Sequence, residues 1–282
     1  LCSQADPPSA GGLLSFVRLV IAPPLMQLQY FAAVLIASVP FWLLGASTGW
    51  TLLPGLPASA FMFIAPATAA TYMVLRSQGA RGASTWLCSH FSPPFGNLAF
   101  FGLLALLAPA LLLFFAYLLS QLTSAPAPAQ QITAETFLRF LTLVSLFAIP
   151  ALMEELGWTG YALPRLRQRL STLAASVFLG VMWSIWHWIP LVQIGRDLTW
   201  IASWSAATVA MRLLICVTAL NSRMPVLVAT TFHASANAAW QMYPVNASHY
   251  DPLVHSLVLG VSCLLVLLFF GPQLQVRRSS EQ

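Results

Sequence analysis

Two adjacent glutamates, Glu154 and Glu155, are the residues of this sequence whose type and position most clearly indicate chemistry. They lie inside a long apolar stretch, whereas the other acidic residues, of seven in all, fall in expected loops or tails. A carboxylate at the centre of a membrane helix costs about 2.5–3.5 kcal/mol on insertion scales, and two adjacent carboxylates resist joint ionisation. We therefore interpret the pair as a functional site; the structural alternative is a protonated pair that fixes helix packing.

The two carboxylates are expected to have different roles. Adjacent residues of a helix point about 100° apart, so both side chains cannot meet one target equally. We expect one of them to act on the substrate or on water and the other to orient a partner. Arg212, inside another apolar stretch, is the candidate counter-ion, unless its side chain extends to the cytoplasmic interface instead.

Histidine and asparagine side chains extend this candidate site. His187 and His233 lie in two further apolar stretches, and Asn237 follows His233 by one helical turn, on the same face. A lone histidine in an apolar helix is usually a packing residue, but two together with a carboxylate pair suit acid–base catalysis. The remaining histidines are expected near membrane surfaces, where solvent exposure explains them: His90, His249 and His255.

The elements that must position these residues are membrane helices. Of 282 residues, 59% are hydrophobic and 7% charged, whereas a soluble domain has about 25% charged residues. A β-barrel does not fit, because barrel strands alternate apolar and polar residues. The sequence predicts an all-α, polytopic bundle of about eight transmembrane helices, near residues 25–45, 56–75, 98–120, 136–163, 172–190, 200–220, 225–241 and 253–271.

Domain boundaries follow from these stretches. We expect an N-terminal segment at 1–24, a single transmembrane bundle at 25–272 and a cytoplasmic tail at 273–282. With a rise of 1.5 Å per residue, Glu154, both histidines and Asn237 lie roughly 12–24 Å from the cytoplasmic edge. The stretch 136–163 would be about 42 Å long, so it has to tilt or bend, which we expect at Gly157 and Gly160.

The arginines predict the orientation of the bundle. The net charge of +5 arises from twelve basic residues, all of them arginine, and in a membrane protein their positions indicate topology rather than a nucleic-acid partner. If eight helices alternate, Arg139 and Arg196 lie on one side. The opposite side carries Arg18, Arg76, Arg81, Arg165, Arg167, Arg169, Arg223, Arg277 and Arg278. The positive-inside rule then places both termini in the cytoplasm.

In their order along the chain, these residues resemble the motifs of the CPBP family, membrane proteases also called the Abi or type II CAAX prenyl endopeptidase family. The family pattern is Glu-Glu-x-x-x-Arg, Phe-x-x-x-His and His-x-x-x-Asn, each on its own helix. The resemblance covers about residues 136–241. It departs from the pattern at Thr159, where the family has Arg, and at Trp183, a conservative exchange for Phe. Arg165 or Arg212 is a possible replacement for the missing arginine.

The resemblance implies an intramembrane endopeptidase, and two mechanisms stay open. In the first, Glu154 and His187 activate water, while His233 and Asn237 donate hydrogen bonds to the oxyanion. In the second, Glu154, His187 and His233 are ligands of a zinc ion. We favour the first, without a cofactor, because Asn237 suits an oxyanion donor better than a zinc ligand.

The expected substrate is a peptide or protein at the cytoplasmic membrane face, and no nucleic-acid partner is expected. The chain is rich in Ala and Leu and contains arginine but no lysine. We therefore expect a multi-pass protein of a bacterial inner membrane. Such a host makes a prenylated CAAX substrate unexpected. The alternatives are a proton- or ion-coupled transporter and a catalytically silent immunity or scaffold relative.

Overall fold

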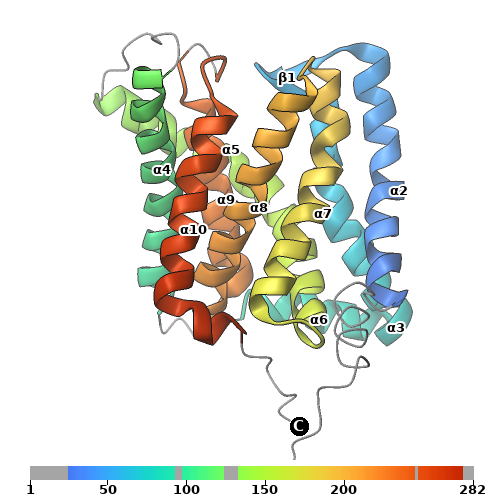
Figure 1. Cartoon of the computed structure of the whole chain (residues 1–282). Helices are drawn as coiled ribbons and strands as arrows, with labels where there is room; N and C mark the ends of the chain where they lie inside the picture. The colour runs from blue at the N-terminus through green and yellow to red at the C-terminus, as the bar shows by residue number, and fades with distance from the viewer. Residues whose placement is uncertain (1–24, 93–96, 124–132, 245–246, 276–282) are drawn as a thin grey trace, which may run out of the picture.

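The chain forms a bundle of membrane-length helices (Figure 1). The computed structural model describes residues 25–92, 97–123, 133–244 and 247–275. The expected N-terminal segment and most of the expected tail, including Arg18, Arg277 and Arg278, lie outside the described residues. In chain order the elements are α2 (Leu25–Thr48), β1 (Thr51–Leu53), β2 (Leu56–Pro57), η1 (Ala58–Ile64), α3 (Ala65–Ser89), α4 (Leu98–Thr123), α5 (Ala134–Glu155), η2 (Leu156–Ala162), α6 (Leu163–Arg167), α7 (Thr172–Gln193), α8 (Leu198–Leu220), α9 (Pro225–Gln241) and α10 (Pro252–Gln275).

The prediction of an all-α membrane bundle is confirmed. Each predicted apolar stretch corresponds to one helical passage, and seven passages among the described residues are long and apolar enough to cross a membrane. The eighth passage, α9, has 17 residues and packs between α5, α4 and α8. Because protein rather than lipid surrounds α9, most of its residues are buried and many are small or polar. The chain is therefore a multi-pass membrane protein.

Two ends of the bundle are distinguished below. The hairpin end carries the antiparallel β1–β2 hairpin, the α7–α8 turn and residues 247–251, whereas the α6 end carries α6 and the second half of α3 (Figure 1). Which end faces the cytoplasm stays a prediction. The lipid-facing sides of the outer helices are apolar, with Ile36, Phe100 and Leu268 exposed by 71%, 66% and 77%.

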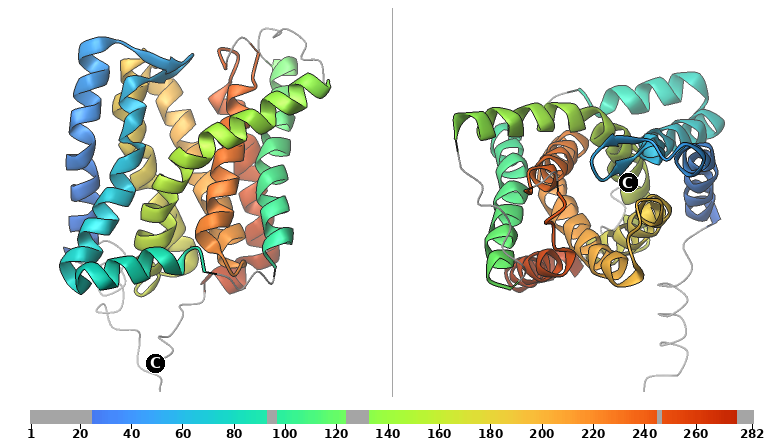
Figure 2. Two further views of the ribbon diagram at one scale, coloured as in Figure 1. Left: turned by 180° about the vertical axis from the view of Figure 1, so that it is seen from behind. Right: turned by 90° about the horizontal axis from the view of Figure 1, so that it is seen from above.

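Part of the connection between the second and third predicted stretches is helical, because α3 continues beyond residue 75 to Ser89. At Gly79 the backbone of α3 turns out of helical geometry, with φ of 68° and ψ of −176°. Glycine reaches positive φ without the strain that a Cβ atom causes, so the helix changes direction here and then continues to Ser89. The second half of α3 runs across the α6 end of the bundle (Figure 2).

The fourth passage is both tilted and irregular. It extends over 34 residues from Ala134 to Arg167, and α5 crosses the bundle obliquely (Figure 2). Directly after Glu155 the helix widens into the π-helical η2, in which the amide of Leu163 bonds the carbonyl of Trp158 five residues back. The expected bend at Gly157 and Gly160 thus takes the form of a π-helical segment that contains both glycines.

Candidate active site

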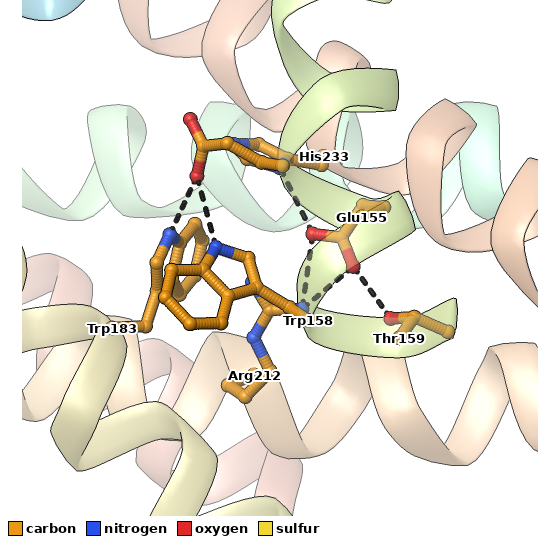
Figure 3. Close-up of polar contacts among 7 residues, drawn as sticks. Glu155, Trp158, Thr159, Trp183, Arg212 and His233 are labelled. Atoms are coloured by element: carbon orange, nitrogen blue, oxygen red, sulfur yellow. Dashed lines mark hydrogen bonds and ion pairs between the residues drawn. The ribbon is translucent and has the colours of Figure 1, made fainter. Parts of the chain in front are cut away.

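Glu155 is the centre of a buried polar network (Figure 3). Its carboxylate accepts two hydrogen bonds from Nη1 of Arg212, at 2.8 and 3.0 Å, and forms an ion pair with that side chain. Nδ1 of His233 lies 3.0 Å from Oε1, and the hydroxyl of Thr159 donates to Oε2. Glu155 and Arg212 are both 0% exposed. The network therefore joins η2, α8 and α9 to the end of α5.

Arg212 reaches Glu155 because α7 and α8 approach closely. A Cβ atom at Gly180 of α7 would lie 2.9 Å from Cα of Val209 and 3.2 Å from Cβ of Arg212 on α8. Only glycine allows this approach without displacing a neighbour. The guanidinium of Arg212 also lies over the ring of Trp183, 4.0 Å from its centre. The expectation that Arg212 is the counter-ion of the glutamates is met at Glu155, and its side chain does not extend to the interface.

Glu154 has a different environment from Glu155. Its Oε2 accepts hydrogen bonds from the indole nitrogens of Trp183, at 2.8 Å, and Trp158, at 3.4 Å. Both hydrogen bonds end on Oε2, and no described side chain forms a hydrogen bond with Oε1. Indole donors orient a carboxylate without neutralising its charge. Glu154 is thus held in place with one oxygen left for a water molecule or substrate.

The two histidines are oriented through their Nδ1 atoms. Nδ1 of His187 lies 2.8 Å from the carbonyl oxygen of Trp183. Because a carbonyl only accepts, Nδ1 of His187 carries the proton, and its Nε2 keeps a lone pair when the ring is neutral. In the same way, Nδ1 of His233 donates to Glu155, which leaves Nε2 of His233 for another partner. Both Nε2 atoms are therefore available for chemistry.

A cavity of about 480 Å³ connects these groups to the hairpin end. Glu154, Trp183, His187, His233 and Asn237 all line it. The rest of the lining is largely aliphatic and aromatic and comes from the hairpin, η1 and the hairpin-side halves of α5, α7, α8 and α9. It includes Leu53, Leu56, Phe63, Phe147, Pro150, Leu191, Trp200, Trp204, Trp240 and Tyr250. The cavity is thus an apolar chamber with a polar deep end.

The cavity meets the exterior of the molecule in two places. Leu52 of the hairpin lines it and is 40% exposed, which places one opening at the hairpin end. Leu146 of α5 also lines it and is 55% exposed on the side of the bundle that faces lipid. An elongated apolar molecule with a polar centre, such as a peptide, fits a chamber of this kind.

The fit of a zinc ion can be judged from the donor set. Three ligands were predicted, Glu154, His187 and His233, and Nε2 of each histidine is free to bind a metal. Across residues 25–275, with the gaps given above, no three His, Cys, Asp or Glu side chains come together closely enough to hold an ion. As placed, the three side chains do not form a metal site, which neither supports nor excludes zinc binding.

Comparisons with known proteins agree with this geometry. Residues 136–239 match the family described as type II CAAX prenyl endopeptidase Rce1-like. A protein of Methanococcus maripaludis named CAAX prenyl protease 2 is 25% identical over 260 residues, which cover 85% of this chain and 92% of that protein. Both matches include the part of the chain that holds the candidate site, and they support the resemblance of this part to the CPBP family.

The two departures from the CPBP family pattern, Thr159 and Trp183, both lie next to the two glutamates. Thr159 does not supply a charge, but its hydroxyl bonds Glu155, and the guanidinium that pairs with Glu155 comes from Arg212 on α8. Arg165, the other candidate replacement, lies over the ring of Tyr161 and bonds the carbonyl of that residue. The ion pair is therefore present with its cation on another helix.

Trp183, which stands where the family pattern has Phe, adds a hydrogen bond to the site, so the exchange is not conservative. The indole N–H of Trp183 forms the shorter of the two bonds to Glu154, and phenylalanine has no donor for it. Trp158 was also missed as a donor, although it follows Glu154 by one helical turn. His255 is a further correction, because it is 4% exposed and lines the cavity instead of facing solvent.

Proposed function

We propose that this protein is an intramembrane endopeptidase that hydrolyses a peptide bond of a membrane-associated peptide or protein with water activated by Glu154 and His187. The observation that carries this proposal is the position of Glu154. Its Oε1 has no partner among the described side chains, and the residue lies at the deep end of an apolar cavity that His187, His233 and Asn237 also line. A carboxylate in this setting is a general base with access to water.

The proposed reaction follows from the orientation of each side chain. Glu154 removes a proton from water, and Nε2 of His187 accepts a hydrogen bond from the same water molecule. The resulting hydroxide attacks the carbonyl carbon, and the oxyanion accepts hydrogen bonds from His233 and Asn237. The proton held by Glu154 then passes to the leaving amine as the C–N bond breaks. For His233 to donate through Nε2 its ring is an imidazolium, for which the bonded Glu155 is the counter-charge.

The Glu155–Arg212 pair has a positioning role in this scheme. It contacts His233 but does not line the cavity, so it acts on the reaction through the histidine. Removing one partner of a buried ion pair costs about 3–5 kcal/mol, because the other charge stays buried without compensation. Substitution at either position therefore affects folding as well as activity.

The face of the membrane that supplies the substrate is part of the proposal. The sequence analysis places both the termini and the substrate at the cytoplasmic face. Most described arginines of the connections lie at the α6 end, which the positive-inside rule places in the cytoplasm, whereas the cavity runs to the hairpin end. If the substrate enters through the opening at the hairpin end, the expected orientation and the expected cytoplasmic substrate do not both hold. The positive-inside rule applies to membrane proteins in general, so we keep both termini in the cytoplasm. We therefore propose that the substrate enters from the non-cytoplasmic face. The proposed location is a cell membrane, with a bacterial inner membrane as the expectation.

Substitution of Glu154 tests the proposed function. Wild-type protein and the Glu154→Gln variant are incubated in liposomes with a mixed peptide library, and products are identified by mass spectrometry. Cleavage should fall by about 10²–10⁴-fold in the variant, the contribution typical of a general base. Glu135→Gln is the matched control, because Glu135 is exposed in the first turn of the same helix, and it should cleave at the wild-type rate.

Four outcomes would overturn this proposal or its mechanism. Equal cleavage by wild type and Glu154→Gln would remove Glu154 as the base. Proton-dependent uptake without any cleavage would favour a transporter, and neither activity would favour a silent immunity or scaffold relative. A metal content near one zinc ion per chain, lost together with activity in His187→Ala, would replace the cofactor-free mechanism by a metal-dependent one.

A further inference from the structure

The hairpin end of the cavity has a polar feature that the proposed reaction does not use. Among the described side chains that line the cavity, two have a buried nitrogen atom without a hydrogen-bond partner, Nε of Arg196 and Nδ1 of His255. Both lie far along the chamber from Glu154, at the α7–α8 turn and in the first turn of α10. A buried donor without a partner is costly, so its presence in a cavity indicates a bound group that supplies an acceptor.

Arg196 is held rigidly at this place. The amide of Gly195 bonds the carbonyl of Val192, and the amide of Arg196 bonds that of Leu191, which together form a Schellman motif with Gly195 at a φ of 77°. The next residue, Asp197, caps α8 by accepting a bond from the amide of Trp200. Two helix caps thus fix the backbone on both sides of Arg196.

A chain of aromatic contacts connects the two unpartnered nitrogens along the wall of the cavity. The guanidinium of Arg196 lies 4.5 Å from the ring centre of Trp200. The rings of Trp200 and Tyr250 are 6.0 Å apart, and those of Tyr250 and His255 are 5.2 Å apart. All four residues line the cavity. Arg196 forms no ion pair with a described residue, so its positive charge faces the chamber without a counter-ion.

The geometry points to a carboxylate-binding subsite, and we propose that Arg196, with His255, binds a carboxylate of the peptide substrate. This proposal rests on the proposed function for the scissile bond and deepens it. The cavity then has a negative group, Glu154, at its deep end and a positive group at its hairpin end. A guanidinium matches a carboxylate with paired donors, and Nδ1 of His255 supplies one more donor when it carries the proton.

The length of the cavity limits where this carboxylate lies. His187 lies six positions before Gln193, the last residue of α7, which corresponds to roughly 9 Å along a helix, and Arg196 follows in the next turn. An extended chain covers about 3.3 Å per residue, so the carboxylate lies about three or four residues beyond the scissile bond. Two sources supply such a group, the C-terminus of the substrate or the side chain of an Asp or Glu at that position.

Binding of three matched peptides tests the subsite. The probes are apolar N-acetylated hexapeptides, one with a free C-terminus, one with a C-terminal amide and one with an amide and Glu as the last residue. Dissociation constants are measured with the Glu154→Gln protein in detergent, so that hydrolysis does not interfere. The free acid should bind about tenfold or more tightly than the apolar amide, because bonds to a charged group are the strong ones. Binding of the Glu-containing amide as tight as the free acid supports a site for any carboxylate, and weaker binding supports one for the C-terminus.

Variants of Arg196 and His255 complete the test. Arg196→Gln should remove the preference for the acid, Arg196→Lys should restore part of it, and His255→Ala should reduce it. Arg139→Gln is the matched control, since Arg139 is an exposed arginine at the same end that does not line the cavity, and it should keep the full preference. Equal binding of acid and amide, or a preference that survives Arg196→Gln, would overturn the subsite. A preference without any cleavage by wild type would refute the proposed function alone.

Discussion

The indole N–H groups around Glu154 separate its chemistry from that of its neighbour. Glu155 forms an ion pair with a buried guanidinium and does not line the cavity, whereas Glu154 lines the cavity and has one oxygen without a partner among the described side chains. Two carboxylates at adjacent positions therefore have unlike surroundings, because a helix points their side chains in different directions. In the proposed mechanism, Glu154 is therefore the base and Glu155 the positioning group, although the two residues are identical.

Trp183→Phe measures the value of one indole donor. The substitution keeps an aromatic ring beside Arg212 and His233 but removes the 2.8 Å bond to Glu154. Since a hydrogen bond to a charged group contributes about 1.5–3 kcal/mol, we expect the rate constant kcat to fall by roughly 10- to 100-fold with little change in KM. The control is Trp188→Phe, which removes a donor that bonds Ser205 at an exposed site. A Trp183→Phe protein with wild-type kcat would contradict the proposed role.

Residue types alone predicted only part of this site. Four of the five candidate side chains and the counter-ion Arg212 were proposed because ionisable groups in apolar stretches are rare and costly, and Asn237 was proposed because it follows His233 by one helical turn. The donors Trp158 and Trp183 could not, because a tryptophan in an apolar helix is usually a packing residue. Whether its N–H meets a carboxylate depends on the rotation of the helix, which the sequence does not specify.

At the scale of elements, the π-helical η2 contacts both glutamates, Glu154 through Trp158 and Glu155 through Thr159. Its wider turn begins directly after Glu155, and Gly157 lies so close to α2 and α3 that an added Cβ atom would meet Tyr30 and Pro66 at 2.5 Å. Such irregular turns are frequent at functional sites. The passage lengths and the bend could be predicted from apolar stretches and glycines, but not the π geometry or the kink at Gly79, which depend on contacts with other helices.

Gly180→Ala tests whether the approach of α7 to α8 positions Arg212. The added methyl would lie 2.9 Å from the backbone of Val209, so α8 has to shift and the bond from Arg212 to Glu155 lengthens. We expect a loss of about 1–3 kcal/mol in the free energy of unfolding, as for other overpacked sites, together with reduced cleavage. Thermal unfolding in detergent and a peptide assay measure both.

The control for this substitution is Gly260→Ala in α10. A Cβ atom at Gly260 would meet no atom within 4 Å. Alanine favours a helix over glycine by about 0.5–1 kcal/mol, so this variant should be unchanged or slightly more stable. Equal stability of the Gly180 and Gly260 variants would show that the α7–α8 contact tolerates a side chain.

At the scale of the whole molecule, the charge distribution and the cavity lie at opposite ends. The α6 end carries the described arginines at positions 76, 81, 165, 167, 169 and 223, whereas the hairpin end carries those at 139 and 196. The cavity runs from the middle of the bundle to the hairpin end. The number of passages could be predicted from the sequence, but the position of the cavity could not, because it arises from the tilt of α5 against α9.

Labelling of cysteines with a membrane-impermeant maleimide tests the orientation in intact cells. Cys88 is exposed in the second half of α3, at the α6 end, and should be protected from the reagent. A Thr51→Cys variant that lacks Cys2 and Cys88 should react, because Thr51 is exposed on the hairpin. Labelling of Cys88 with protection of the hairpin position would reverse the predicted orientation and place the cavity opening in the cytoplasm.

The opening of the cavity at the hairpin end has a practical consequence if the predicted orientation holds. Water for hydrolysis would come from the non-cytoplasmic side of the membrane, and short products would leave on that side without crossing the bilayer. An inhibitor with an apolar body and a terminal acid would match the chamber and reach it from the same side. Such a compound would not have to cross this membrane, so neither entry into the cytoplasm nor export from it would limit its action.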